Sequence, residues 1–337
     1  MKTQFIETKK IDLGSFSTNK GVILEPAEAC YTLYGDLENG KKLALFFHGF
    51  SSNSEMHNWW AKFPIELVSQ SFNILCINAL GSCHGSCGPD SINAKTGKSY
   101  KENFPKISMQ DTVDFTAAVL SKLKIQKLDY VFGCSLGGMQ ALDMFVRYPE
   151  YAEKYIAVCA SPLTLMTKIA SIAQAKIISD GIKLNLSEDE LRSRMGLSRL
   201  FFRMACTTEK ALSKLQRKLS GGENSAGMQP LEDFFLADSF EFENAFSPYS
   251  FNLYSRMLIE FELDLSKCNG NTNSELVLID ISEDQFTSTQ KILEVMKALR
   301  KKARKVRRRK FKTDYGHEAW IIDGERFYDF IKVEFNI

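Results

Sequence analysis

One short stretch constrains the fold more than any other, because a predicted strand, a glycine-rich turn and a predicted helix follow one another in it. The apolar run Leu128–Phe132 predicts a buried strand, and Met139–Arg147 predicts a helix. Between them lies the pattern Gly-x-Ser-x-Gly, formed by Gly133, Ser135 and Gly137. This order of strand, sharp turn and helix is the context that a nucleophile elbow requires.

Ser135 is therefore the candidate nucleophile. The turn would hold the serine in a strained backbone conformation and present its oxygen at the N-terminus of the next helix. Backbone N–H groups and the helix dipole favour a developing negative charge there. An incidental turn is the alternative, since the five-residue pattern often arises by chance. The flanking strand and helix favour the catalytic interpretation.

Strand patterns alternate with helix patterns along most of the chain, which predicts an α/β fold with a mainly parallel, doubly wound sheet. Antiparallel strands are expected first, and strands buried on both faces follow. The expected strands are 23–27, 30–34, 43–47, 72–77, 128–132, 155–159, 275–279 and 306–311. The expected helices that alternate with them are 109–122, 139–147, one from residue 290, and 325–331.

A central stretch of the chain shows helical periodicity and no convincing strand. Its expected helices are 163–178, 188–195, 200–219 and 253–261. We interpret this stretch as a helical lid insertion that covers the carboxyl edge of the sheet. The predicted organisation is a core of residues 1–162 and 270–337 and a lid of residues 163–269.

A serine hydroxyl is a weak nucleophile, so it needs a base that is oriented by an acid. In folds with this elbow the partners follow in the order serine, acid, histidine, and His317 alone among the four histidines comes after the elbow. The acid is expected in the loop after strand 275–279. Asp284 stands at the usual distance past that strand, and Glu283 is the alternative.

Acyl transfer also needs donors for the oxyanion that forms on the attacked carbonyl. One backbone N–H normally follows the nucleophile, here at Leu136, and the other comes from an earlier loop, here at Phe50. Losing one such donor typically slows the reaction by about a hundred- to a thousandfold.

Composition argues against secretion, membrane insertion and metal binding. The sequence shows no apolar run of the length that a signal peptide or a bilayer span needs. The eight cysteines lack the spacing of a metal site, and reduced cysteines in a cytoplasmic protein are the simplest interpretation.

The basic residues are unevenly distributed. Residues 297–312 include 11 basic and no acidic residues, which leaves the rest of the chain with a net charge of −9. The run contains a single aromatic residue, Phe311, and is not a tail, so a solvated face is favoured over nucleic acid binding.

A glycine-rich loop and several shorter motifs point to one family. Residues 78–89 read Asn-Ala-Leu-Gly-Ser-Cys-His-Gly-Ser-Cys-Gly-Pro. The supporting motifs are Trp59-Trp60, Phe104-Pro105, Gly138-Met139-Gln140 and Tyr148-Pro149-Glu150. On these residues most of the chain resembles the homoserine O-acetyltransferase family of acyltransferases, which implies the α/β-hydrolase fold.

The resemblance implies a ping-pong reaction in which acetyl-CoA acylates Ser135 with His317 as base. The hydroxyl of homoserine or a similar amino acid then takes the acyl group, as in methionine biosynthesis. It implies acceptor binding by Glu318 and Arg203, an acid for the ammonium and a guanidinium for the carboxylate. For Arg203, a surface arginine is the alternative. Small-molecule substrates, a homodimer joined through the lid, and no bound cofactor are also implied.

The sequence departs from the family pattern mainly at the positions that are expected to bind the acceptor. Glu318 stands where the family has aspartate, and Lys210 stands where a tyrosine is expected. If residues 282–287 are compared with the acid loop of the family without a gap, Glu283 takes the position of the acid. A serine esterase that uses water as acceptor is therefore the alternative function, and a silent binding protein is a weaker one. Acetyl, succinyl and longer donors stay open, and the phosphates of CoA are a candidate partner for Lys312.

Overall fold

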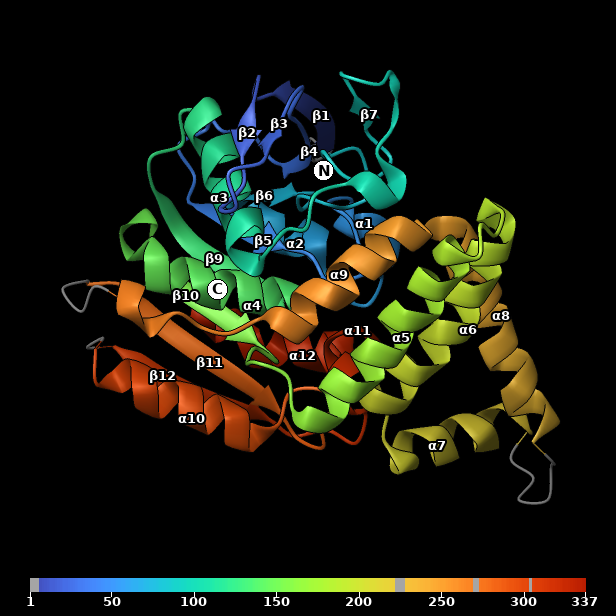
Figure 1. Ribbon diagram of the computed structural model, residues 1–337. Coiled ribbons are helices and arrows are strands. Elements are labelled where there is room, and N and C mark those ends of the chain that lie inside the picture. The colour runs from blue at the N-terminus through green and yellow to red at the C-terminus, as the bar shows by residue number, and fades with distance from the viewer. Residues whose placement is uncertain (1–5, 222–227, 269–272, 303–304) are drawn as a thin grey trace.

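The computed structural model describes residues 6–221, 228–268, 273–302 and 305–337, and an eight-stranded sheet lies at its centre (Figure 1). In spatial order its strands are β1 (Ile6–Asp12), β4 (Glu28–Tyr34), β6 (Asn73–Ile77), β5 (Leu43–Phe47), β9 (Leu128–Cys134), β10 (Ala152–Val158), β11 (Glu275–Ile281) and β12 (Val306–Phe311). β4 pairs antiparallel with β1 and β6, and the other neighbouring pairs are parallel. The predicted mainly parallel sheet is confirmed.

Helices cover both faces of the sheet. One face carries α3 (Met109–Lys122), α4 (Leu136–Arg147) and α10 (Thr289–Arg300). The other carries α1 (Met56–Trp59), α2 (Ile65–Ser71), α11 (Ala319–Ile322) and α12 (Gly324–Ile331). Side chains alternate along a strand, so Val131 faces the first core and its neighbour Phe132 faces the second. The sheet is thus buried on both sides, as its apolar strands predict.

Between β10 and β11 the chain forms the helices called the lid below (Figure 1). They are α5 (Leu165–Lys183), α6 (Glu188–Cys206), α7 (Glu209–Leu219), α8 (Gln229–Ala245) and α9 (Pro248–Glu260). Figure 1 shows them beyond the carboxyl ends of the parallel strands, on the side where β11 points.

Two details of the lid differ from the sequence prediction. The single helix expected over 200–219 is wrong, because α6 ends at Cys206 and α7 begins after Thr208. The Thr208 hydroxyl accepts a hydrogen bond from the Ala211 N–H at 3.0 Å, so it caps the new helix. Helix α8 had not been predicted at all.

The N-terminal part differs as well. Strand β1 was not predicted, and the strand expected over 23–27 shrinks to β3 (Ile23–Leu24), which pairs with β2 (Phe16–Ser17). Pro26 has no N–H to give to a strand ladder, so it stops the pairing. A second small hairpin joins β7 (Ile92–Asn93) and β8 (Lys98–Ser99). No helix of the described ranges is long and apolar enough to cross a membrane.

The basic run falls on α10 and on β12, the last strand of the sheet. Arg308 forms a two-pronged ion pair with the buried Asp280, at 2.8 and 2.7 Å. Arg307 and Arg309 both pair with Glu334, which is almost fully buried. These three arginines therefore attach the edge strand to the core, a role the sequence had not suggested.

Candidate active site

Ser135 stands at the junction of β9 and α4 in the strained conformation expected of an elbow, with φ 58° and ψ −122°. A Cβ at Gly133 would lie 2.1 Å from the carbonyl oxygen of Gly137, and a Cβ at Gly137 would lie 2.3 Å from that of Phe47. Both positions must be glycine for the backbone to pass. The Ser135 N–H donates to the Val158 carbonyl at 2.9 Å, which ties the turn to the neighbouring strand.

The structure brings the three predicted triad residues together. Ser135 Oγ lies 2.7 Å from His317 Nε2, and His317 Nδ1 lies 2.8 Å from Asp284 Oδ2. All three side chains are buried. His317 comes from the turn after β12 and Asp284 from the loop after β11, so separate strands present them at one edge of the sheet. A proton on Nδ1 that is donated to Asp284 leaves Nε2 free to accept from the serine.

The acid loop distinguishes the two candidate carboxylates. Asp284 Oδ1 accepts from the N–H groups of Phe286 and Thr287, at 2.8 and 3.0 Å. Its Oδ2 accepts from the Thr287 hydroxyl at 2.7 Å as well as from His317. Glu283 has a φ of 62° and is exposed. Asp284 is thus the carboxylate in contact with the histidine, and four donors hold it in place. Sequence reasoning missed Thr287.

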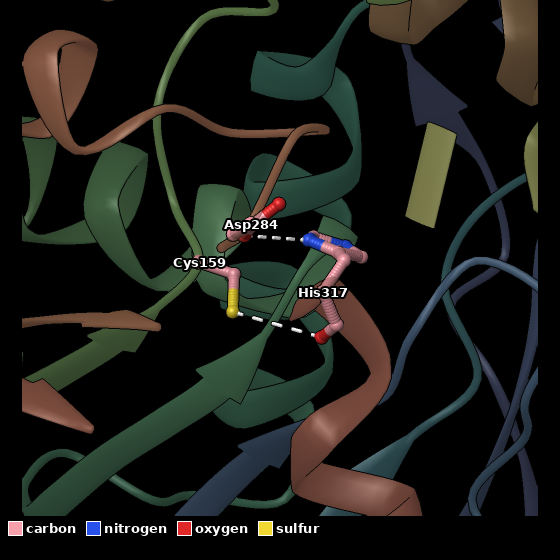
Figure 2. A group of neighbouring side chains, drawn as sticks. All are labelled: Cys159, Asp284 and His317. Carbon is pink, nitrogen blue, oxygen red and sulfur yellow. Dashed lines mark hydrogen bonds and ion pairs between the residues drawn. The ribbon is translucent and has the colours of Figure 1, made fainter. Parts of the chain in front are cut away.

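A cysteine, Cys159, lies beside this pair, as Figure 2 shows. Cys159 Sγ lies 3.9 Å from the His317 carbonyl oxygen, and burial raises the thiol's pKa well above its usual value. The side-chain ligand atoms of Cys159, Asp284 and His317 lie within 4.8 Å of one another. A metal ion there would have to separate Asp284 from His317, which already hydrogen-bond to each other. This group therefore fits acid–base chemistry better than metal binding.

The loop of the second expected oxyanion donor, Phe50, lies against the start of α4. The carbonyls of Phe47 and His48 approach the position of a Gly137 Cβ to 2.3 and 2.7 Å. His48 fixes this loop, because its Nδ1 lies 2.8 Å from the Gly49 carbonyl and its Nε2 accepts from the Ala79 N–H at 3.1 Å. Burial lowers the His48 pKa to about 4, so the ring is neutral.

The glycine-rich loop 78–89 connects core and lid. Asn78 Oδ1 accepts from the Ser54 N–H at 2.6 Å, and the Asn78 side-chain amide donates to the His84 carbonyl at 2.6 Å. From the lid, the Tyr254 hydroxyl donates to the Leu80 carbonyl at 3.1 Å. A Cβ at Gly81, where φ is 89°, would lie 2.8 Å from Leu253 of the same helix. The loop therefore positions helix α9 over the sheet.

A row of aromatic side chains leads from the Phe50 loop through the lid to the catalytic histidine. Phe50 packs against Phe202 of the lid with ring centroids 6.0 Å apart, and Phe202 packs against Phe286 at 5.1 Å. Phe286 contacts the His317 ring at 4.7 Å. Ser135 is only 4% exposed, so the site is shielded from bulk water.

A cavity of about 540 Å³ opens between lid and core, and Ser51 and Glu318, the chain neighbours of Phe50 and His317, are among the residues that line it. Its walls are largely apolar, with Trp59, Leu212 and Ile321 among them, and Lys62, Lys214 and Lys218 also line it. Arg203 lines it as well. Lys310 and Lys312 line a different cavity, together with Phe330.

The two residues expected to bind the acceptor contact each other. Arg203 Nη1 donates to Glu318 Oε2, and the Arg203 Nε and Nη2 atoms donate to the two carboxylate oxygens of Asp238. Arg199 Nε also donates to Asp238, at 3.0 Å. Burial opposes the charge on Arg203, but Glu318 and Asp238 outweigh it and raise the arginine's pKa. Lys210 pairs with Asp314 instead, at 3.6 Å.

The sequence analysis did not identify Asp238 or Arg199 as residues of the site. Their pairing joins α8 to α6 across about forty residues of chain, and no local pattern encodes such a contact.

The chain resembles known proteins over nearly its whole length. It is 27% identical to the homoserine O-acetyltransferase of Pasteurella multocida, over 91% of this chain and 92% of that relative. The predicted resemblance to this family of sequences is confirmed.

Solved structures share the architecture. The crystal structure of esterase E22 matches with a TM-score of 0.84 at 19% identity, over 97% of this chain and 99% of that one. Homoserine O-acetyltransferase from Bacillus anthracis matches with a TM-score of 0.82 at 20% identity, over 98% and 97% of the two chains. Both show the fold expected from the sequence. The family described as alpha/beta hydrolase fold matches residues 44–321, and the chain therefore belongs to that family.

Proposed function

We propose that the protein is an acyltransferase that moves an acyl group from acyl-CoA, through an ester of Ser135, to the hydroxyl of homoserine or a similar amino acid. The observation that carries this proposal is the chain of contacts from Ser135 through His317 to Asp284, at 2.7 and 2.8 Å. The similarity to homoserine O-acetyltransferases supports the choice of acceptor.

In the first half-reaction His317 Nε2 removes the proton from Ser135 Oγ as the oxygen attacks the thioester carbonyl. The negative charge on the carbonyl oxygen is stabilised by the backbone N–H groups of Phe50 and Leu136. When the carbon–sulfur bond breaks, His317 gives this proton to the sulfur of CoA, which leaves as the thiol. Ser135 is left as an ester, and Asp284 stabilises the imidazolium that forms in between.

In the second half-reaction the acceptor takes the place of CoA. His317 removes the proton of the acceptor hydroxyl, and the resulting oxygen attacks the ester carbonyl of Ser135. Collapse of the tetrahedral intermediate returns the proton to Ser135 Oγ and releases the acylated amino acid. The burial of Ser135 supports this step, because water that reached the ester would hydrolyse it before the acceptor arrived.

Arg203 and Glu318 are the proposed acceptor-binding residues. An amino acid carries one carboxylate and one ammonium, and this pair offers the opposite charges, with Glu318 directly after the catalytic histidine in the chain. We propose acetyl-CoA as co-substrate, with no bound metal or other cofactor, and a place in methionine biosynthesis.

Hydrolysis, with water as the acceptor, is the second candidate. One observation favours it: Arg203 is already paired with Asp238 and Glu318 in the free protein. If Arg203 stays bound to these two carboxylates, it cannot bind the carboxylate of an amino acid, and water is the acceptor that remains.

The lid is also the proposed interface of a cytoplasmic homodimer. Leu165, Met166 and Ile169 lie in the first five residues of α5 and are 81%, 77% and 62% exposed, and Met204 on α6 is 72% exposed. Such a set of apolar side chains is typical of an interaction surface. A change of Met166 and Ile169 to serine should yield monomers in analytical ultracentrifugation. A wild-type chain that sediments as a monomer would contradict this part.

One assay tests the reaction: release of CoA thiol from acetyl-CoA, with and without homoserine. Transfer predicts release that depends on homoserine and yields O-acetylhomoserine in equal amount. Release that ignores every hydroxyl amino acid would leave hydrolysis as the function. Ser135→Ala should abolish release in either case, and activity that survives in this variant would exclude both.

A further inference from the structure

The arginine expected to bind the acceptor already holds a carboxylate of the protein itself. We propose that Asp238 occupies, in the free protein, the place on Arg203 that the acceptor's carboxylate takes during turnover, and thereby sets the acceptor specificity. This inference rests on the proposed transfer to an amino-acid hydroxyl and names the residue that tunes it.

The geometry of the contact is the first argument. Arg203 uses Nε and Nη2 toward the two oxygens of Asp238, with Nε 3.1 Å from Oδ2. Two parallel N–H bonds to one carboxylate are the arrangement that a guanidinium offers to any carboxylate, including that of a free amino acid. Asp238 and an acceptor therefore compete for the same donors.

A second arginine makes the exchange feasible. Arg199 Nε donates to Asp238 Oδ2 at 3.0 Å, and its guanidinium lies over the Phe242 ring at 4.2 Å. Phe242 lies one helical turn beyond Asp238 on α8, so Arg199 is attached to the same helix as the aspartate. When Arg203 turns to the acceptor, Asp238 keeps a cationic partner. The exchange replaces one ion pair by another and leaves no half-buried carboxylate alone.

The charge balance of the cluster explains which acceptors can enter. Arg199 and Arg203 face Asp238 and Glu318, and the side chains of all four are between 12% and 19% exposed. A zwitterion brings one charge of each sign, so its carboxylate can replace Asp238 on Arg203 while its ammonium replaces Arg203 on Glu318. A neutral alcohol or water brings neither charge and leaves the pairs closed. Asp238 thus discriminates by charge, and it lowers the affinity for the amino acids it admits.

Two substitutions should act in opposite directions. Asp238→Asn removes the competing charge, so kcat/KM for homoserine, at saturating acetyl-CoA, should rise about tenfold through a lower KM. Arg199→Gln removes the alternative partner, so Asp238 should stay on Arg203 and kcat/KM should fall about tenfold. A purely structural ion-pair network predicts losses in both variants. Transfer to 1-propanol, a neutral alcohol that cannot open the Asp238–Arg203 pair, should rise above the wild-type background in Asp238→Asn and stay at that background in Asp238→Glu.

Calorimetry of homoserine binding separates this inference from the proposed function. It compares Ser135→Ala with Ser135→Ala/Asp238→Asn, neither of which can turn over, and thermal melting verifies that both are folded. Tighter binding by the double variant supports the inference even if the wild-type protein transfers nothing to homoserine, in which case the proposed function alone fails. Transfer by the wild type, with kcat/KM unchanged or lower in Asp238→Asn, overturns the inference alone. If homoserine binds neither variant, both proposals are overturned.

Discussion

Replacing Asp284 by asparagine should change the tautomer of the catalytic imidazole. The N–H groups of Phe286 and Thr287 donate to Asp284 Oδ1, so the amide oxygen of an asparagine must take that place. Its NH₂ group then faces His317 Nδ1, where a donor replaces an acceptor. Nδ1 must then accept a hydrogen bond from that NH₂ group, so the ring proton moves to Nε2. Nε2 would donate this proton toward Ser135 Oγ. A histidine in this tautomer cannot take the serine proton.

The expected loss in kcat is about 10⁴-fold, as for the same change in other serine–histidine–aspartate sites. It corresponds to about 5.5 kcal/mol of transition-state stabilisation. Glu283→Gln is the matched control, because Glu283 is the adjacent carboxylate and is exposed. Its kcat should stay within about twofold of the wild type, since surface substitutions away from the site have small effects.

The burst of p-nitrophenol from p-nitrophenyl acetate measures acylation of Ser135, and homoserine-dependent thiol release from acetyl-CoA measures turnover. Both rates should fall in Asp284→Asn while the melting temperature shows that the protein is folded. Equal losses in the two variants, or a loss below tenfold in Asp284→Asn, would refute the assignment of the acid and the tautomer argument with it.

Three further predictions concern the support of the site. Gly137→Ala would place a Cβ 2.3 Å from the Phe47 carbonyl oxygen, so the free energy of unfolding in urea should fall by about 3 kcal/mol or more; an unchanged value would contradict the close approach. Thr287→Val removes a hydroxyl donor to Asp284 and should lower kcat about tenfold. Thr287→Ser keeps a hydroxyl and should retain the wild-type kcat. A valine variant with wild-type kcat would show that the hydroxyl is dispensable. Burial raises the pKa of Asp143 to about 6, above the usual value of 3.8 for an aspartate, so the fold favours the protonated form. This group therefore contributes stability at low pH that is lost as the pH rises through about 6. Asp143→Asn should flatten the change in unfolding free energy between pH 4 and pH 7, and an unaltered pH profile would speak against this shift.

The elbow could be predicted because its requirements are local. A strand, a turn with no room for side chains and a helix follow one another within twenty residues. The strand and the helix are visible as apolar patterns, and the crowded turn requires the glycines at 133 and 137. His317 followed from chain order alone. The acid was harder, because Glu283 and Asp284 are adjacent and both fit the spacing. The left-handed backbone at Glu283, with its φ of 62°, decides which of them faces the histidine, and sequence spacing does not encode it.

The lid was predicted less well than the core. Its helices lack the flanking strands that define the core helices, and α8 carries phenylalanines that give no clear amphipathic pattern. The break between α6 and α7 did leave a signal, since Thr208 precedes Glu209 as a capping residue should. The pairing of Arg203 with Asp238 left none, because it depends on how two lid helices pack.

The arginines of β12 have a consequence for the solution behaviour of the protein. A sheet with eight strands in an open order has two exposed edges, and unpaired backbone at such edges can recruit another copy into a growing aggregate. Lys9 and Lys10 stand on β1 at one edge, and Arg307 to Lys310 form most of β12 at the other. Charged side chains on both edge strands make edge-to-edge addition of a second copy unfavourable, because a docking strand would have to bury them. The same residues that attach β12 to its own core thus protect the chain from fibrous self-association.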